Sequence, residues 1–369
     1  MKQNTLKFLV ASTLLTTACA PTASEKPHNY SELTVFTPPT YVCYKAPAPI
    51  TIDGKMDAAE WDAIPWSSEF VDIEGDKQPK PTLQTRTKMT YTNEGMYFAC
   101  LMEEPHVWGN ITEHDAVIYH DNDFEIFLNP SNDTHNYLEY EINALGTDWD
   151  LYLSKPYRDA GHAILNNWEF AGMQKAVHID GTLNNPSDTD KSWSVEVFIP
   201  WKSIYQVMRG KEAPVNGEQL RVNFSRVQWT TEVKDGKYVK IPKPGKDKIA
   251  EYNWVWSPSG VINIHLPESW GFVQISDKVA GKATDTFVTN PDESIKWLLR
   301  NLYYRQNQYR GANKAYATQL ATLQPETLGE DAAIIETLQL HTTPSMYEIS
   351  VVSPHTGKTW SIRQDGFVW

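Results

Sequence analysis

The sequence predicts a mainly β protein: an antiparallel β-sandwich over about residues 41–275, followed by a C-terminal helix and a small β-sheet over residues 276–369. Two observations predict the sandwich. Apolar and polar residues alternate in several short segments, and turn-forming residues separate these segments. A third observation predicts the appendage, because apolar residues after residue 275 recur at the spacing of a helix.

Four segments show the alternation that is typical of half-buried strands. The residues expected to face the core are Phe124, Ile126 and Leu128; Leu138, Tyr140 and Ile142; Trp193, Val195, Val197 and Ile199; and Leu220, Val222 and Phe224. Glutamates occupy intervening positions, namely Glu125, Glu139, Glu141 and Glu196. Carboxylates crowded on one surface repel each other, so we expect Arg221, Arg226, a lysine or a cation to neutralise them. Segments 166–191 and 241–248 are rich in turn formers and are predicted to be loops.

The region after residue 275 begins with a helix signal. Asn290 is a capping residue, Pro291 suits the first helical position, and acidic residues follow in the first turn. A second short helix is expected over residues 316–323, and residues 346–369 are expected to form a strand meander.

The N-terminus carries the features of a secretory signal peptide. Lys2 and Lys7 precede a short apolar stretch, and small residues lead to Cys19. "TTAC" resembles a bacterial lipobox, so residues 1–18 are predicted to be removed and Cys19 to be lipidated, with residues 19–40 as a tether. The protein is then exported, either lipid-anchored to the outer membrane or cell surface, or periplasmic. A cytosolic protein with an apolar N-terminus is the alternative.

The formal net charge of −13 limits the partners. An acidic surface argues against nucleic acid and against anionic lipid, so any membrane association should depend on the lipid anchor alone. The same charge is compatible with a neutral ligand and with a divalent cation.

Cys43 and Cys100 lie in two segments that both have strand character. In an oxidising compartment two neighbouring strands could bring them within bonding distance, which predicts a disulfide. Two buried free thiols are the alternative.

Four stretches together resemble the family 9 carbohydrate-binding modules. They are "ITIDGKMDAAEWDAIPW" (50–66), "YHDNDFEIFLNPSNDTHNYLEYEINALGTDWDLYL" (119–153), "WSVEVFIPWKSI" (193–204) and "WSPSGVINIHLPESWGFVQI" (256–275). "FVDIEG" (70–75) and "KPYRD" (155–159) are similar to the single-module secreted versions common in the Bacteroidetes. The resemblance spans about residues 41–275.

This resemblance implies a β-sandwich that binds a polysaccharide or oligosaccharide without cleaving it, often between two aromatic side chains, with structural Ca²⁺ in some members. Tyr119 matches the position of one aromatic, and Trp254 is the expected second. Aromatic rings suit the apolar face of a pyranose, and polar groups suit its hydroxyls. The further candidates for sugar contact are Trp108, Trp168, Arg158, Arg226 and Glu125. The expected role lies in carbohydrate catabolism, with an outer-membrane glycan-degrading assembly as a further partner.

The sequence also offers candidates for three other types of functional site. The carboxylates of the strands could serve a glycoside hydrolase or an accessory subunit of one, because such enzymes use a pair of acids. Asp72, Glu74 and Asp76 supply the oxygen ligands that calcium prefers. Met102 and His106 could bind haem, as in related sandwich domains. No histidine pair has zinc spacing.

Overall fold

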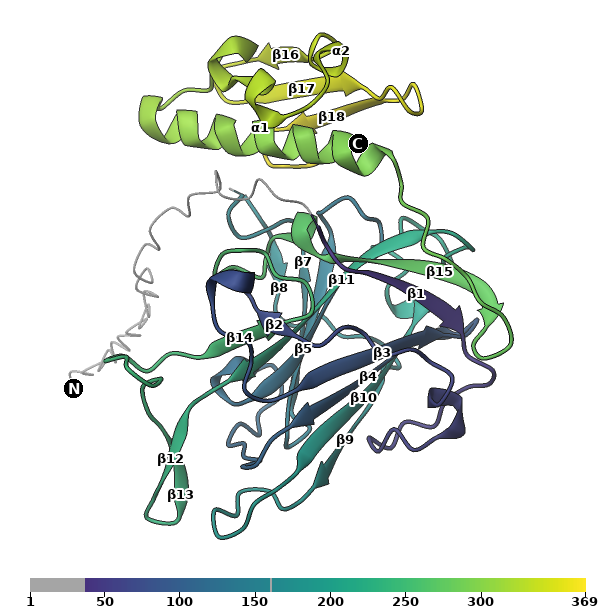
Figure 1. Cartoon of the computed structure of the whole chain (residues 1–369), viewed down its shortest axis with the longest axis vertical. Helices are drawn as coiled ribbons and strands as arrows, with labels where there is room; N and C mark the ends of the chain where they lie inside the picture. The colour runs from purple at the N-terminus through teal and green to yellow at the C-terminus, as the bar shows by residue number, and fades with distance from the viewer. Residues whose placement is uncertain (1–36, 160) are drawn as a thin grey trace, which may run out of the picture. The chain divides into compact units, whose positions relative to one another are not determined.

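The computed structural model describes residues 37–159 and 161–369 (Figure 1). The predicted signal peptide, the lipidation site Cys19 and most of the tether lie outside the described residues. The chain forms a mainly β structure with a C-terminal helical region, which confirms the predicted fold class. In the described part of the chain, no helix combines the length and the apolar character that a membrane span requires.

The first layer of the sandwich is an antiparallel array (Figure 1). Ile126 pairs with Tyr140 on one side and with Phe224 on the other, so the predicted apolar faces are in register. The strands, in spatial order, are β8 (Ile164–Leu165), β7 (Asp148–Leu153), β6 (Tyr137–Asn143), β5 (Asp123–Asn129) and β11 (Gln219–Gln228).

The second layer contains β10, whose alternation was also predicted. Its strands, in spatial order, are β1 (Thr40–Lys45), β3 (Thr85–Tyr91), β4 (Gly95–Glu103), β10 (Ser192–Pro200) and β9 (Gln174–Asp180). Strand β9 corrects the prediction that residues 166–191 are a loop. Among the named strands β9 pairs only with β10, and such an edge strand is only half buried, so its sequence lacks a clear apolar face.

The two layers are parts of one continuous sheet that folds over. Strand β15 (Gly271–Val279) pairs antiparallel with the first half of β11 and parallel with β1. The second half of β11 pairs instead with β14 (Tyr252–Val255), which pairs with β2 (Val71–Asp72). A separate hairpin consists of β12 (Thr231–Lys234) and β13 (Lys237–Lys240).

The 3₁₀ turns are η2 (Ala59–Trp61), η3 (Gly75–Lys77), η4 (Ile118–His120), η5 (Trp201–Ser203), η6 (Pro267–Ser269), η7 (Leu320–Leu323) and η8 (Pro325–Leu328).

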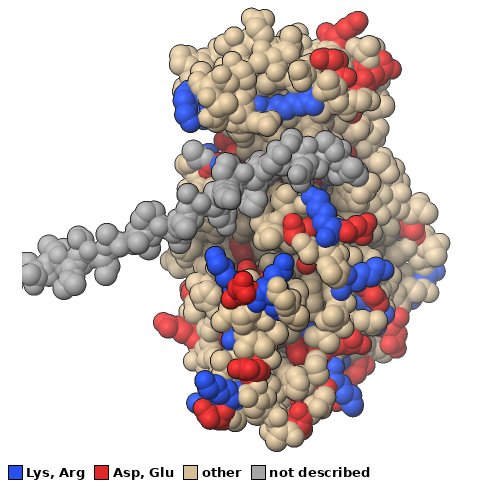
Figure 2. Space-filling model, turned by 60° about the vertical axis from the view of Figure 1, so that its left-hand side comes forward, with Lys and Arg blue, Asp and Glu red and all other residues tan. Residues whose placement is uncertain are grey.

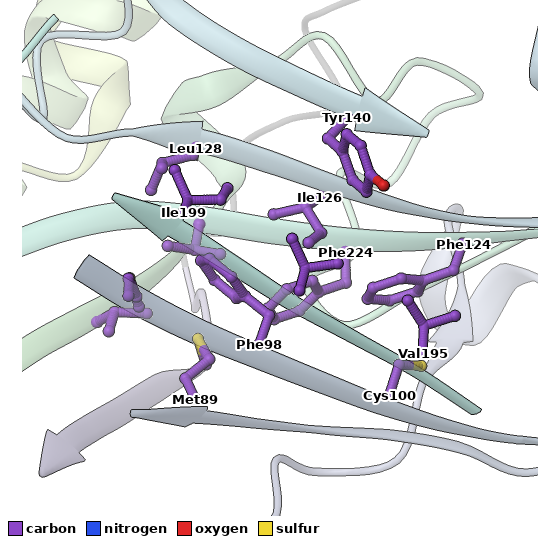
Figure 3. Close-up of a cluster of buried hydrophobic side chains, with 14 of the residues drawn as sticks. Met89, Phe98, Cys100, Phe124, Ile126, Leu128, Tyr140, Val195, Ile199 and Phe224 are labelled. Atoms are coloured by element: carbon purple, nitrogen blue, oxygen red, sulfur yellow. The ribbon is translucent and has the colours of Figure 1, made fainter. Parts of the chain in front are cut away.

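The core lies between the layers (Figure 3). The ring of Phe224 stacks on that of Phe124 at a centroid distance of 5.7 Å and meets Phe98 from the other layer edge-on at 5.9 Å. Burying a large apolar side chain contributes about 1.5–3 kcal/mol, so these layers are held mainly by apolar contact.

The C-terminal region packs a long helix on a small sheet. Helix α1 (Asp292–Asn313) begins one residue after the predicted first position, Pro291, and the amide of Asp292 donates to Oδ1 of Asn290 at 3.0 Å. The remaining elements are α2 (Ala332–Ile335), β16 (Gln339–Thr342), β17 (Tyr347–Val352) and β18 (Thr359–Arg363). The prediction of a second helix over residues 316–323 is wrong, because only the 3₁₀ turn η7 forms there.

Cys43 and Cys100 are buried free thiols, so the predicted disulfide is wrong and the alternative holds. Cys43 lies on β1 and Cys100 on β4, and β3 runs between these strands. Burial raises the pKa of both thiols, which keeps them protonated.

Candidate functional site

Four carboxylates gather on the face of β5 and β6 that points away from the core. Asp123 and Glu125 belong to β5, Glu139 and Glu141 belong to β6, and all four are buried. Glu125 pairs directly with Glu141 across the ladder. Directly opposed residues lie about 4.5–5.5 Å apart at Cβ, and like charges there repel each other. We call these four residues the acidic floor.

Burial raises the pKa of every member of the acidic floor. For Glu125 the pKa rises to about 7, first because of burial, while a hydrogen bond from Ser225 acts in the opposite direction. Oδ2 of Asp123 and Oε2 of Glu139 are buried without a hydrogen-bond partner. A buried acceptor without a partner costs about 1–3 kcal/mol, so the acidic floor is a costly arrangement for the fold.

The arginines expected to neutralise these glutamates are engaged elsewhere. Arg221 pairs with Glu293 at 2.8 Å, and Arg226 pairs with Glu104 at 3.1 Å. Figure 2 shows acidic and basic residues interspersed over one face of the sandwich, with no large field of one sign.

Two tyrosines lie beside the acidic floor with part of their rings in solvent. Tyr119, in η4, is 38% exposed, and its amide donates to Oε2 of Glu141 at 3.0 Å. Tyr157 is 42% exposed. Its pKa is raised by burial first and then by Glu139 and Glu141, so it lies in the field of the same acids. The two tyrosines and the acidic floor form the candidate site.

The turn that carries Tyr119 is held from outside the acidic strands. The indole Nε1 of Trp229 donates to the carbonyl oxygens of Tyr119 at 2.9 Å and of Asp121 at 3.2 Å. Nζ of Lys240 lies 3.6 Å from the centre of the Trp229 ring, and such cation–π contacts contribute about 0.5–2 kcal/mol. These contacts position Tyr119 at the edge of the site.

The acidic floor can interact with a ligand in two ways. Oxygen atoms of Asp123, Glu125 and Glu141 lie within 4.8 Å of one another, which is close enough to hold one cation. The same oxygens can accept hydrogen bonds from several hydroxyl groups, and a protonated member can also donate one.

The structure does not bring the predicted second aromatic to this site. Trp254 is 3% exposed, because its side chain on β14 points into the core, 5.2 Å from the guanidinium of Arg226. Trp108 is buried as well. Trp168 is half buried and packs on Tyr152 at 5.5 Å. A buried ring cannot stack on a saccharide, so Trp254 and Trp108 are corrected to structural residues.

The two predicted arginines are also structural. Arg226 is fully buried and donates to Thr85, Gln228 and Glu104. Nη2 of Arg158 lies 2.9 Å from Oε1 of Glu268, and its Nε donates to the hydroxyl of Tyr303 in α1. Neither guanidinium has free donors at the acidic floor.

Tyr157 is the residue that the sequence interpretation missed. It lies in the "KPYRD" segment, directly before Arg158, the residue predicted to contact the sugar. The charge of Arg158 favoured it as a hydrogen-bonding residue for a sugar. Only the tertiary structure shows that Tyr157 is the exposed member of the pair.

The proposed calcium ligands do not converge. Oδ1 of Asp72 accepts the amide of Glu74 at 3.0 Å, and Oε2 of Glu74 accepts from Gln78 at 2.6 Å. These local bonds use the carboxylates within one turn, and in the described residues the converging acidic groups lie elsewhere. Calcium binding as such stays a prediction.

The positions of Met102 and His106 do not support the haem hypothesis. Met102 is fully buried in the core, whereas the ring of His106 contacts Tyr238 at 5.6 Å. The two side chains are therefore not presented together to a ligand.

No family model matches the sequence, and no curated protein matches it. Among solved structures, a proposed carbohydrate-binding protein from Bacteroides uniformis is similar, with 14% identity and a TM-score of 0.48 over 65% of this chain and 100% of that chain. A family 9 carbohydrate-binding module from Caldicellulosiruptor kristjanssonii in complex with cellotriose has 14% identity and a TM-score of 0.40 over 66% of this chain and 98% of that chain.

The structure of a family 9 module from the same organism in complex with glucose also has 14% identity and a TM-score of 0.40, over 66% of this chain and 100% of that chain. At these values the similarity concerns the course of the chain and does not bear on its ligand.

Proposed function

We propose that this protein binds a saccharide at the site formed by Tyr119, Tyr157 and the acidic floor, without cleaving it. One observation carries the proposal: two half-exposed tyrosine rings lie in the field of buried carboxylates that lack cationic partners. The site thus combines flat apolar surface with a concentration of hydrogen-bond acceptors.

A saccharide satisfies both parts of this site. Its C–H face is apolar and packs on an aromatic ring, and its hydroxyl groups donate hydrogen bonds to carboxylates. Hydroxyl groups that approach the 5% of Glu125 and of Glu139 that is exposed would offset part of the repulsion between the acids. A bare cation would satisfy the acids but would leave the two exposed rings without a role.

Binding is tested by isothermal titration of the full chain against a panel of neutral oligosaccharides and polysaccharides. We expect affinity for at least one glycan, reduced about tenfold by Tyr119→Ala and by Tyr157→Ala, because the loss of ring stacking costs about 1 kcal/mol or more. Tyr205→Ala is the matched control, because Tyr205 is equally exposed and lies outside the site. The proposal would be contradicted if Tyr119→Ala and Tyr157→Ala bound the glycan as tightly as Tyr205→Ala does. It would also be contradicted if the unmodified chain bound no glycan.

The same samples distinguish binding from hydrolysis. We expect no release of reducing sugar from any glycan that binds. Release that Glu125→Gln abolishes would instead favour the glycoside hydrolase alternative.

The proposed cellular setting is an exported protein, anchored through a lipid on Cys19 to the outer membrane or cell surface, or periplasmic. There it would hold glycan fragments for a glycan-degrading assembly in carbohydrate catabolism. Metabolic labelling of the native host with a palmitate analogue tests the anchor, and Cys19→Ala should abolish incorporation.

A further inference from the structure

A second group of ionisable side chains lies at a hollow of the sandwich. The group consists of His114, Asp115, Asp150 and Glu169, and we call it the His114 group. His114 and Glu169 line a hollow of about 590 Å³, and this hollow contains no residue of the acidic floor and neither of its tyrosines. His114 and Asp115 precede η4, Asp150 lies on β7, and Glu169 lies between β8 and β9.

The donor atoms of the His114 group converge on one point. Nε2 of His114 lies 3.0 Å from Oε1 of Glu169 and 3.4 Å from Oδ1 of Asp115. One donor atom from each of the four residues lies within 4.8 Å of all the others. Two ligands about 2.0–2.1 Å from one zinc ion lie about 2.9–3.4 Å apart at tetrahedral or octahedral angles, so the distances from His114 to Glu169 and to Asp115 fit a shared metal ion.

A second interaction orients the imidazole toward this point. Nδ1 of His114 lies 3.0 Å from the carbonyl oxygen of Asp148 and 3.0 Å from its Oδ1. The Nδ1–H group donates to these oxygens, so the lone pair of a neutral ring is on Nε2 and faces the carboxylates. Metal-ligating histidines commonly have such a carboxylate or carbonyl partner, which sets the tautomer and the ring orientation.

Two buried carboxylate oxygens of the His114 group have no hydrogen-bond partner, and a proton on His114 does not provide one. A proton on Nε2 satisfies His114 and Glu169. It leaves Oδ1 of Asp115 and Oδ1 of Asp150 buried without a hydrogen-bond partner. Asp150 is almost completely buried, and its other oxygen already accepts the amide of Phe170 at 2.8 Å. A divalent ion at the point of convergence would engage one carboxylate oxygen of each aspartate.

We propose that the His114 group binds a divalent transition-metal ion of the zinc class. One imidazole nitrogen with three carboxylate oxygens is a donor set that such ions accept, whereas Ca²⁺ prefers six to eight oxygen ligands. The hollow leaves one side of the ion accessible to water or to an oxygen of a ligand. The metal site is independent of the saccharide site, because the two share no residue.

The test uses the full chain, purified without a histidine tag and treated with a chelator that is then removed. Titration with ZnCl₂ should show one strong site per chain, and CoCl₂ should give the visible absorption of a coordinated ion. His114→Gln should abolish the strong site, and Glu169→Gln should weaken it at least about tenfold. Glu113→Gln is the matched control, because Glu113 is an exposed neighbour outside the group. It should bind zinc as the unmodified chain does.

Folding and specificity are checked on the same samples. Glu169 has a 65% exposed side chain, so its substitution should leave the melting temperature of the metal-free protein unchanged. Zinc should raise the melting temperature of the unmodified chain and not that of His114→Gln. Absence of a stoichiometric zinc site would overturn the proposal. It would also be overturned if His114→Gln and Glu169→Gln bound zinc undiminished, or if calcium displaced zinc at similar concentration.

Discussion

The indole N–H of Trp61 donates a 2.7 Å hydrogen bond to Oε1 of Glu196, a carboxylate with no exposed surface. Oε2 of the same side chain accepts the amides of Asp53 at 2.9 Å and of Gly54 at 2.8 Å. One carboxylate on β10 therefore holds both the Asp-Gly turn and the short turn η2. The left-handed backbone of Gly54, with φ of 85°, lies so close to Val177 that a Cβ atom would be 2.7 Å from its carbonyl carbon.

Glu196→Ala should destabilise the fold by about 3 kcal/mol or more, because it leaves three donors without their acceptor. Trp61→Phe removes only one of these bonds and should cost about 1–2 kcal/mol beyond the loss of ring volume. Urea unfolding measures both. Asp57→Ala, an exposed change in the same segment, is the control and should lie within about 0.5 kcal/mol of the unmodified chain. Equal stability of Glu196→Ala and the control would contradict this role.

The acidic floor should make stability fall as pH rises. A carboxyl whose pKa is raised in the folded state favours folding when protonated, and this contribution is lost between its unfolded pKa of about 4.3 and its folded pKa. For Glu125 the folded pKa is about 7. Glu125→Gln carries no charge at any pH. The stability of the variant relative to the unmodified chain should therefore increase by about 1–3 kcal/mol between about pH 5 and about pH 7.5.

Urea unfolding of both proteins at the two pH values measures this difference. The comparison cancels the contributions of other titrating groups, such as His114, His135 and Asp150. A difference that is the same at both pH values would show that Glu125 ionises normally.

The buried Arg158–Glu268 pair should control how firmly the C-terminal helix is held. Tyr304 of α1 also donates to Glu268, and Tyr303 donates to Asp159. Burial alone would raise the pKa of Glu268, but Arg158 and Arg300 lower it to about 2. The contribution of this carboxylate is thus present above about pH 4.3 and is lost as pH falls toward 2.

Glu268→Ala should cost about 3 kcal/mol at neutral pH, because it leaves the buried Arg158 guanidinium with only the more distant carboxylate of Asp159, at 3.6 Å, as a charge partner. Hydrogen exchange should accelerate first in α1, over residues 292–313. Glu336→Gln, an exposed change in the same region, should leave the exchange unchanged. If α1 is protected from hydrogen exchange equally in Glu268→Ala and in Glu336→Gln, the Arg158–Glu268 pair does not hold the helix.

Cys43 and Cys100 should both react with an alkylating reagent in denaturant without prior reduction, and peptide mass spectrometry identifies the modified peptides. Reductant should leave the melting temperature unchanged. Cys43→Ser should destabilise the protein by about 1–3 kcal/mol, because it places a hydroxyl group in the core, whereas Cys43→Ala should cost less. If the two cysteines react with the alkylating reagent only after reduction, they form a disulfide in the protein and the expectation of free thiols is wrong.

Alternation explains which parts of the sandwich could be predicted. Phe124, Ile126 and Leu128 recur every second residue, and the two-residue period of a strand places such residues on one face. The same period already placed Arg226 on the core face of β11, two residues after Phe224, and the prediction of a sugar contact overlooked this. In "YNWVW" Tyr252, Trp254 and Trp256 share one face, and the alternation by itself did not show that this face points inward.

The sequence by itself determined much of the local structure: the strand segments of β5, β6, β10 and β11 and, to within one residue, the start of α1 at Asp292. These features depend on residues that are near each other in the chain. The tertiary structure alone decided which side chains meet. Strand order separated the two cysteines, placed Tyr157 beside the acidic floor and brought His114 to Asp150. Such encounters depend on pairing between distant segments, and the short-range periodicity of one chain carries no record of it.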